Sequence, residues 1–596
     1  MRTSLLARSS GIAGASHAVA PRGRFVPARD TLLRALRGIR PSLLIALGAA
    51  LALATAAIVL ARRGHDEGDD VVTFTRDIAP LVWAKCAPCH RPGEAGPFSL
   101  LGYDDVVRRK SQIAKVTRTR YMPPWKPVPG YVHYANDRSL DDAQIALLQR
   151  WIDSGAREGD PADLPAMPTW PEGWQLGTPD LVVQMPQTYT VPADGRDVYR
   201  NFVLPTGVTG AHWIAAWELR ADGATSIHHA IVNLDKHGWA RRRDAEDAEP
   251  GFPGMDPGDI QAPDGFYLVW TPGKAPSPPI PGTAWQLDGS TDLVLQLHLQ
   301  PTGKPQTVQP TIGLYFTPEP PTRPRITIKI GDPYIDIAPG IADYAITDTL
   351  ELPCDTDVLG LFPHAHYLAR KMRVWARRPD DAQRWLLVID DWDFAWQEEY
   401  TLAEPLHLPR GSAITMEFHY DNTAANERNP NQPPRRVTSG ERSVDEMGNV
   451  TLELAPTDPH DIDALREAKY RRALARDASN PREHYNLANT LAREGRRDDA
   501  IAEYRVAVGL APQLAPASFN LANLLLAAGR VDEAIAAYEA AIKAQPQFPE
   551  AELNLGNAVA KRGDKPGAIA HYRKALQLRP GYFEARRALA DAGAAP

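Results

Sequence analysis

The C-terminal part of the chain repeats itself every 34 residues, and this period constrains the fold more than any other feature of the sequence. After Pro456 the composition shifts to Ala, Leu, Arg and Glu, residues that favour helices. A unit of this length is a pair of helices joined by a turn, and such units stack on one another. We therefore predict an α-solenoid over residues 462–590. The positions that recur are Asn486, Asn520 and Asn554, Gly495, Gly529 and Gly563, Tyr504, Tyr538 and Tyr572, and Pro512, Pro546 and Pro580.

The period and its residue types are typical of tetratricopeptide repeats. Three full repeats are present, and Tyr470 marks an incomplete one before them. Most of the recurring positions are packing residues, whereas the concave face of such an array is a surface for a protein partner. The repeats thus predict a fold and a protein partner, but no reaction.

A pair of histidines spaced two apart, His364 and His366, lies in the apolar stretch 361–367. On a strand they point to the same face, with Cα atoms about 7 Å apart. That spacing allows two imidazoles to bind one metal ion. Two such histidines can equally be ordinary half-exposed strand residues, so a metal needs support from other residues.

Three further stretches supply that support. Adjacent His228 and His229, His298 on a strand over 292–300, and Met447 in a polar Asp-Glu-Met-Gly-Asn turn all carry metal-ligand atoms. Imidazole suits copper, and a thioether adds a preference for Cu(I). The set divides into three histidines on one side and two histidines with a methionine on the other, which predicts two copper ions.

The neighbouring residues decide how these histidines can point. Alternating leucines place His298 on the polar face of its strand, where we expect it to be exposed. Adjacent strand residues face opposite ways, so His228 and His229 reach one ion only at a strand end or a bulge; otherwise one of them is structural. Four other histidines fit no ligand position: His212, His237, His407 and His419.

In this order, the motifs resemble the copper type II, ascorbate-dependent monooxygenases, the peptidylglycine α-hydroxylating and dopamine β-monooxygenase family, over about residues 180–455. The resemblance implies two jelly-roll-like β-sandwiches, 178–320 and 321–455, each with one copper ion. It implies that one copper serves the reaction of O2 with a substrate C–H bond, and that the other passes on electrons supplied by ascorbate. The catalytic copper ligands would be His364, His366 and Met447, and the electron-transfer ligands His228, His229 and His298.

The substrate is not fixed by this resemblance. In the peptidylglycine enzymes an arginine two residues before the His-x-His pair helps to hold the substrate carboxylate, and here that residue is Phe362. Asn449 matches the family, but Thr451 stands where a tyrosine is expected. A glycine-extended peptide is therefore disfavoured, and a small molecule or another protein's side chain stays open.

A Cys-x-x-Cys-His motif, Cys86 to His90, lies in a segment over 72–160 that we expect to be an α-helical cytochrome c domain. This motif attaches c-type haem through both sulfurs, with the histidine as iron ligand. Zinc is disfavoured because a second cysteine pair is missing; Cys354, the third cysteine, is expected to be a small buried residue. For the distal iron ligand we favour Met122, in a proline-rich loop, over His133.

The N-terminus predicts export. Residues 1–41 hold eight arginines and resemble a cytoplasmic leader, and residues 42–61 carry no charge and are long enough to span a bilayer. We expect an uncleaved anchor, with a cleaved signal peptide as the alternative, and a protein on the periplasmic side of a bacterial inner membrane. A net charge of −7 gives no reason to expect nucleic acid as a partner.

Together these features predict a multidomain copper monooxygenase, with electrons relayed from a donor by the tethered haem. Tethering raises the concentration of haem near the coppers. A periplasmic haem and copper protein that transfers electrons or handles copper without activating O2 is the alternative. A third possibility is an interaction protein in which the repeats recruit a partner and the metals are lost.

Overall fold

The computed structural model describes residues 71–595 except 95, 172, 222–224, 237, 255–259, 261–264, 267 and 441. The predicted leader (1–41) and membrane span (42–61), and also His237, lie outside the described residues. In the part of the chain that is described, no helix is both long and apolar enough to cross a bilayer. The described residues thus give no support to the predicted membrane anchor, and they do not show the predicted periplasmic localisation.

The segment that carries the Cys-x-x-Cys-His motif consists of short helices joined by long loops. The longest helix has 12 residues, so the prediction of an α-helical cytochrome c domain is wrong for this segment. Prolines at 123, 124, 127 and 129 prevent a helix between the two longest ones. The helices are η2 (Phe74–Ile78), α3 (Ala79–Lys85), α4 (Tyr103–Arg108), α5 (Lys110–Arg118), α6 (Asp142–Asp153) and η3 (Pro161–Asp163).

Helix α6 illustrates which residues cap and pack the helices of this segment. Asp141 caps its N-terminus, because the carboxylate accepts from the Gln144 backbone N–H and the Gln144 side chain accepts from the Asp141 N–H. Trp151 is fully buried and packs beside Phe74 of η2, with ring centroids 6.2 Å apart. The apolar spacing of this helix therefore serves packing, as its sequence indicates.

The middle of the chain is a β region of antiparallel pairs, which begins with three sheets between residues 181 and 317. One sheet has the order β1 (Leu181–Gln184), β11 (Thr311–Thr317), β4 (Ala211–Arg220), β8 (Trp285–Asp288). A second has the order β6 (Phe252–Pro253), β3 (Val198–Pro205), β9 (Asp292–Leu299), β5 (Ile227–Asp235), β7 (Leu268–Trp270). A small third sheet pairs β10 (Gln306–Val308) with β2 (Tyr189–Val191), and α7 spans Trp239–Ala245. Leucines and isoleucines of the two larger sheets share one apolar core.

Three more sheets lie between residues 326 and 456. One has the order β12 (Ile326–Gly331), β21 (Gly448–Pro456), β15 (Thr356–Ala365), β18 (Tyr400–Leu408). Another has the order β14 (Tyr344–Glu351), β19 (Ala413–Tyr420), β16 (Ala369–Arg377), β17 (Gln383–Ile389). The smallest pairs β13 (Asp336–Ile337) with β20 (Val437–Thr438). Their shared core includes Trp125 and Tyr134, which the proline-rich segment before α6 contributes.

In place of the predicted pair of jelly-roll-like sandwiches, the described strands form a multi-sheet β region. Two of its sheets have only two strands, and the short strands β6 and β13 end close to Gly254 and Pro339. The burial of β9, the strand that holds His298, also differs from the sequence prediction. All residues of β9 are buried, since this strand is central and both of its faces are covered.

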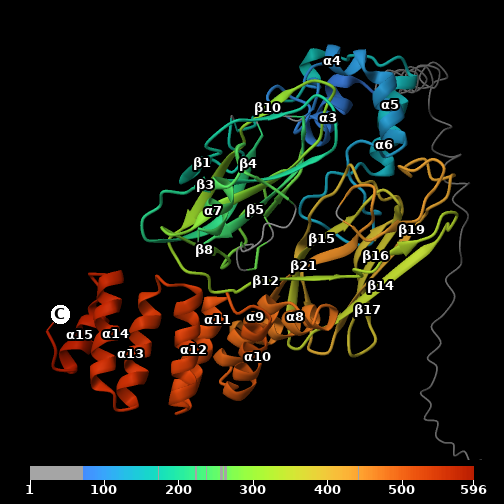
Figure 1. The fold of residues 1–596 in the computed structure, drawn as a ribbon. Helices are drawn as coiled ribbons and strands as arrows, with labels where there is room; N and C mark the ends of the chain where they lie inside the picture. The colour runs from blue at the N-terminus through green and yellow to red at the C-terminus, as the bar shows by residue number, and fades with distance from the viewer. Residues whose placement is uncertain are drawn as a thin grey trace, which may run out of the picture. The chain divides into compact units, whose positions relative to one another are not determined.

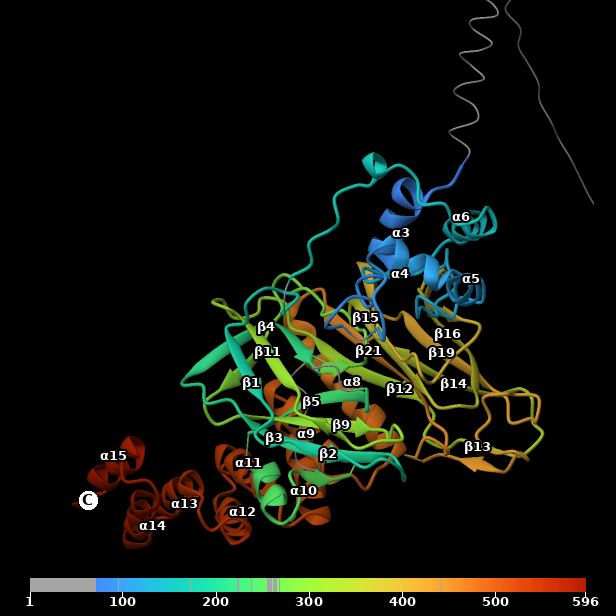
Figure 2. The same cartoon turned by 90° about the horizontal axis from the view of Figure 1, so that it is seen from above.

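The C-terminal helices confirm the predicted tetratricopeptide solenoid. After η4 (Pro459–Asp461) they stack in chain order (Figures 1 and 2). In each full repeat a glycine with positive φ, such as Gly529 at 77°, ends the first helix. A buried tyrosine of the second helix then donates to an asparagine of the first, as Tyr538 does to Asn523 Oδ1 at 2.6 Å. The helices are α8 (Ile462–Arg476), α9 (Pro481–Arg493), α10 (Arg497–Leu510), α11 (Ala515–Ala527), α12 (Val531–Ala544), α13 (Pro549–Lys561), α14 (Lys565–Leu578) and α15 (Phe583–Asp591).

Candidate metal centre

His228, His229 and His298 come together on the neighbouring strands β5 and β9. One ring nitrogen of each lies within 4.8 Å of the others. The strand register explains how two adjacent histidines face one point: Ile227 pairs with Leu299 and His229 with His298, so His228 is an extra residue in β5. A bulge of this kind turns a side chain towards the face of its neighbour. The structure therefore has the bulge that binding by both histidines requires.

The hydrogen bonds of this cluster leave ring nitrogens free for a metal. His298 Nε2 lies 2.9 Å from a carboxylate oxygen of Asp197, which fixes the proton on that nitrogen. His298 Nδ1 is buried and, among the described residues, has no hydrogen-bond partner. The Nδ1 atoms of His228 and His229 lie 3.1 Å apart. A buried imidazole nitrogen without a partner beside two others is the arrangement that a metal ion satisfies.

Burial keeps the imidazoles of His228 and His229 neutral, which is the form that binds metals. Burial, and then the nearby His298, lower the pKa of His228 to about 4. The same two causes, in the same order, hold the pKa of His229 well below its ordinary value. The pKa of Asp197 is lowered, chiefly by its hydrogen bond with His298.

His364 and His366 lie at the end of β15, with ring centroids 5.2 Å apart. In both rings Nδ1 is already engaged. His364 Nδ1 donates to Gln397 Oε1 at 2.5 Å, and His366 Nδ1 to the Asp445 carbonyl oxygen at 3.0 Å. Nε2 is then the nitrogen that each ring offers to a metal. Burial, and then His366, lower the pKa of His364 to about 3, and burial lowers the pKa of His366.

Met447 directly precedes β21, the strand that pairs with the end of β15. The first pairs between these strands are Gly448 with Ala365 and Asn449 with His364. The Met447 backbone is held in place on both sides. Its carbonyl oxygen accepts from the Tyr420 hydroxyl at 3.0 Å, and its N–H donates to Glu446.

Glu446 organises the turn on which these ligands depend. Its fully buried carboxylate also accepts from the backbone N–H groups of His366 and Leu368, so it fixes three donors around the His-x-His end. Burial raises the pKa of Glu446 to about 8, although the three N–H groups favour its ionised form.

Phe394 stands between the two histidine groups. Its ring stacks on His228, with centroids 5.0 Å apart, and meets His366 edge-on at 5.4 Å. It is 5% exposed. The two sets that the sequence assigns to separate copper ions are thus neighbours with one aromatic ring in common.

The Cys-x-x-Cys-His motif follows α3 directly. His90 Nδ1 lies 3.2 Å from the Phe98 carbonyl oxygen, so the ring donates there and leaves Nε2 for another partner. Cys86 and Cys89 are not joined to each other, and burial raises the pKa of both thiols, that of Cys86 to about 12. Both are therefore protonated thiols in the metal-free chain.

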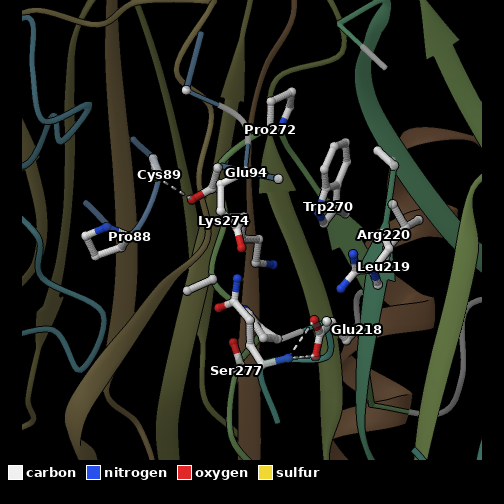
Figure 3. Close-up of a pocket in the computed structure, with 18 of the residues that line it drawn as sticks. Pro88, Cys89, Glu94, Glu218, Leu219, Arg220, Trp270, Pro272, Lys274 and Ser277 are labelled. Carbon is white, nitrogen blue, oxygen red and sulfur yellow. Dashed lines mark hydrogen bonds between the residues drawn. The ribbon is translucent and has the colours of Figure 1, made fainter. Parts of the chain in front are cut away.

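A cavity of about 450 Å³ begins at Cys89 (Figure 3). This volume is in the range of ligand and cofactor sites. Its walls come from the motif loop, from β4 and from residues 269–277. The aromatic residues Trp217 and Trp270 contribute apolar surface, and Lys274 and Arg220 contribute positive charge.

The predicted distal ligands are placed differently. Met122 lies half-buried after α5, and His133 is exposed on a segment that pairs with β18, where its carbonyl oxygen accepts from the Ala403 N–H. Among the described residues, no hydrogen bond or ring contact joins either of them to His90. The choice between them therefore stays a prediction.

Sequence patterns missed four residues of this centre: Asp197, Phe394, Gln397 and Glu446. The first three lie in irregular segments, so no periodicity marks them. Glu446 did carry a signal, because it belongs to the Asp-Glu-Met turn, but its buried role depends on backbone contacts that only the fold supplies.

Comparison with known proteins finds the repeats alone. A tetratricopeptide repeat family model matches residues 466–515 and 519–583. Among solved structures, "Crystal structure of MamA" is 25% identical with a TM-score of 0.21, and the match covers 21% of this chain and 74% of that one. "First TPR of Spaghetti (RPAP3) bound to HSP90 peptide SRMEEVD" is 20% identical with a TM-score of 0.19, over 20% of this chain and 93% of that one. No curated protein matches the chain. The C-terminal segment is thus a tetratricopeptide array, which supports a protein partner for this chain.

Proposed function

We propose that the chain is a copper-dependent monooxygenase that hydroxylates a C–H bond with O2 and draws electrons from a covalently attached c-type haem. The observation that carries this proposal is which ring nitrogens of the histidines are hydrogen-bonded and which are open to a metal ion. Three histidines direct nitrogens at one point, and two others have Nδ1 occupied and Nε2 free beside a methionine turn. A pair of ordinary half-exposed histidines needs no such sorting.

The residues fit the metals that the resemblance implies. His228, His229 and His298 would hold one copper ion, because the unpartnered Nδ1 of His298 is buried among neutral imidazoles. His364, His366 and Met447 would hold the other, and two imidazoles with a weak thioether leave a coordination position open. Copper, when bound, supplies the activation of O2 and the one-electron chemistry of hydroxylation.

The haem fits as well. Cys86 and Cys89 are unpaired sulfurs at the end of a helix, and His90 keeps Nε2 free by donating Nδ1–H to a carbonyl. The cavity beside Cys89 is of ligand size, and of the three motif residues only Cys89 lines it. Haem at this site would supply single electrons, which a tethered donor delivers at high effective concentration.

The protein's own residues hold the geometry. Asp197 and Gln397 fix the tautomers of His298 and His364, so that each ring presents one defined nitrogen. Glu446 ties the His366 backbone to the Met447 turn. Burial of both clusters excludes water and keeps the imidazoles unprotonated.

The substrate proposed here is a small molecule, or a side chain of a peptide or protein, without a carboxylate that needs a clamp. Phe362 and Thr451, at the two positions where the resembled enzymes differ, lie opposite each other in the β15–β21 register. Both side chains are buried, so neither can hold a substrate carboxylate in solvent. Ascorbate is the candidate for the upstream reductant.

One observation favours a second function. Phe394 fills the space between the two histidine clusters, where a substrate would need room. A haem and copper protein that transfers electrons, or handles copper, without activating O2 needs no such room. The repeat array would then bring it to a protein partner.

Oxygen uptake separates the two functions. Protein loaded with copper and haem is supplied with ascorbate and screened against candidate substrates while O2 is recorded. The monooxygenase predicts substrate-dependent uptake that His364→Ala abolishes. Redox cycling of haem and copper with no substrate-dependent uptake for any candidate would favour the second function instead.

A further inference from the structure

The loop between β17 and β18, residues 390–399, contacts both histidine clusters and is joined to the haem motif through Arg138, and we name it the linking loop. Trp392 Nε1 donates to the His366 carbonyl oxygen at 3.2 Å, and Phe394 touches the rings of His228 and His366. Gln397 Oε1 accepts from His364. No sequence motif covers this loop, and a connection between two strands of different sheets does not by itself require so many contacts.

The far end of the loop reaches the haem motif. Glu398 forms an ion pair with Arg138, and Arg138 Nη1 donates to the Gly273 carbonyl oxygen at 3.1 Å. The same carbonyl oxygen lies 3.8 Å from the sulfur of Cys89. In a haem-bearing protein that sulfur is a thioether without a proton, so this step is a van der Waals contact. Figure 3 shows Cys89 and Lys274 at this edge of the cavity.

The residues that form these contacts are buried, and this holds the contacts in one geometry. Gln397 and Glu398 are 5% and 4% exposed, and the Arg138 guanidinium also donates to the Pro124 carbonyl oxygen. A second ion pair, Lys274 with Glu399 at 2.5 Å, runs beside the first. Charges this deeply buried are costly unless they are paired and hydrogen-bonded, so the network holds one geometry.

We propose that the linking loop carries electrons from the haem site directly to the His364–His366 site, through the Arg138–Glu398 ion pair and Gln397. This inference rests on the proposed function and adds the route. In each transfer one electron leaves a ferrous haem, which becomes ferric, and reduces one cupric ion at His364 and His366 to the cuprous state. No bond is made or broken and no proton needs to move. The three-histidine site then exchanges electrons with its neighbour across Phe394.

The route assigns distinct parts to three residues. Gln397 is a positioning residue that joins His364 to the loop, while Arg138 and Glu398 join the loop to the haem side. A substitution of Gln397 at one end, or of Arg138 or Glu398 at the other, lengthens the path between the haem and copper sites and leaves every metal ligand unchanged. Arg138 is suited to this part because its planar fork bonds Glu398, Gly273 and Pro124 at once, which a lysine cannot do.

Stopped-flow mixing tests the route. Full-length protein with ferrous haem is mixed anaerobically with Cu(II), and oxidation of the haem is followed by its visible absorbance. In Arg138→Lys and Glu398→Gln we expect the rate to fall by roughly tenfold, the lower end of what outer contacts cost at metal sites. Haem spectrum, copper content and melting temperature are expected to match the unsubstituted protein.

Arg200→Lys is the matched control. Arg200 is buried, forms an ion pair with Asp247 at 3.0 Å and, among the described residues, bonds none of the linking loop, so this variant should oxidise its haem at the unsubstituted rate. If Arg138→Lys does not fold, Glu398→Gln, which keeps the shape of the side chain, decides. Unchanged rates in both route variants would overturn the route while leaving the proposed function in place. No haem oxidation in the copper-loaded, unsubstituted protein would instead refute the proposed haem-to-copper transfer itself.

Discussion

The two histidine clusters of the β region differ in the ring nitrogens that their hydrogen bonds occupy. At β5 and β9 the Nδ1 atom of His298 has no partner among the described residues while Asp197 holds its Nε2, and the Nδ1 atoms of His228 and His229 bond each other. At β15 the free atoms are Nε2, with the Nδ1 of His364 and His366 held by Gln397 and a backbone carbonyl. The first cluster is a closed set of three imidazoles, whereas the second has two imidazoles beside a methionine turn. The difference teaches that one β region can present both a closed set of three imidazole rings and a pair of rings whose Nε2 atoms stay open.

The largest expected effect comes from removing one ligand at each cluster in turn. His364→Ala should lose the copper of its own site, keep the other, and abolish substrate-dependent O2 uptake. His298→Ala should lose the opposite copper. Copper per chain, measured by mass spectrometry together with O2 uptake, checks both. Loss of all copper in either variant would mean that the five histidines form one site and that the comparison fails.

The second-largest effect is expected from the residues that fix the tautomers of the ligand histidines. Gln397→Leu should weaken copper at His364 and His366 by about 10–100-fold, and Asp197→Asn should do the same at the three-histidine cluster only. Gln397→Leu removes the acceptor of His364, and Asp197→Asn exchanges the charged acceptor of His298 for a neutral amide, yet both leave all six ligands in place. Competition titration with a copper chelator measures both affinities. An equal loss at both clusters from one substitution would contradict separate sites.

The metal-free protein should lose stability in acid because of its buried histidines. The pKa of His228 is about 4 in the folded chain, against an ordinary value near 6.5, so below pH 6.5 the unfolded chain binds a proton that the folded chain does not. The contribution of His228 to the free energy of unfolding is then fully present above pH 6.5 and falls as the pH drops towards 4. At pH 4.5 the loss from this histidine is about 2 kcal/mol. For His364 the fall continues to about pH 3. Urea unfolding of the β region at several pH values, with His228→Asn as the comparison, measures it; a flat profile would rule out burial of neutral rings.

The smallest effect is expected in the repeats. Tyr538→Phe removes the hydroxyl that donates to Asn523 and should cost the solenoid about 1 kcal/mol. Copper content and both affinities should stay unchanged, since Tyr538 belongs to the core of the repeats. Thermal unfolding followed by circular dichroism, with copper analysis of the same sample, gives both results. A change at either cluster would show that the repeats influence the metal sites.

The sequence predicts these regions unequally, for physical reasons. The solenoid fold can be predicted from the 34-residue period, because each repeat packs only on its neighbouring repeats. Gly495, Gly529 and Gly563 recur because the backbone has a positive φ at these positions, which favours glycine. The bulge at His228 follows from the simple rule that adjacent strand residues face apart. His298 was expected to be exposed but is buried, since alternation of polarity cannot reveal that a strand is central.

Other parts could not be read from spacing at all. Asp197, Phe394 and Gln397 acquire their roles from contacts between residues more than 30 positions apart. The helical segment was overestimated, because the prolines between Met122 and Gly130 turn the chain along the β region instead of extending a helix. Long-range contacts of this kind leave no local signal.

Metal content of the purified, unsubstituted chain tests the central claim most directly. Copper and haem iron are measured on the same sample after reconstitution with Cu(I) and haem attachment. We predict two copper ions and one haem per chain, with one copper lost in His364→Ala. A chain that binds no copper, or that takes up zinc in preference, would contradict the assignment of both histidine clusters.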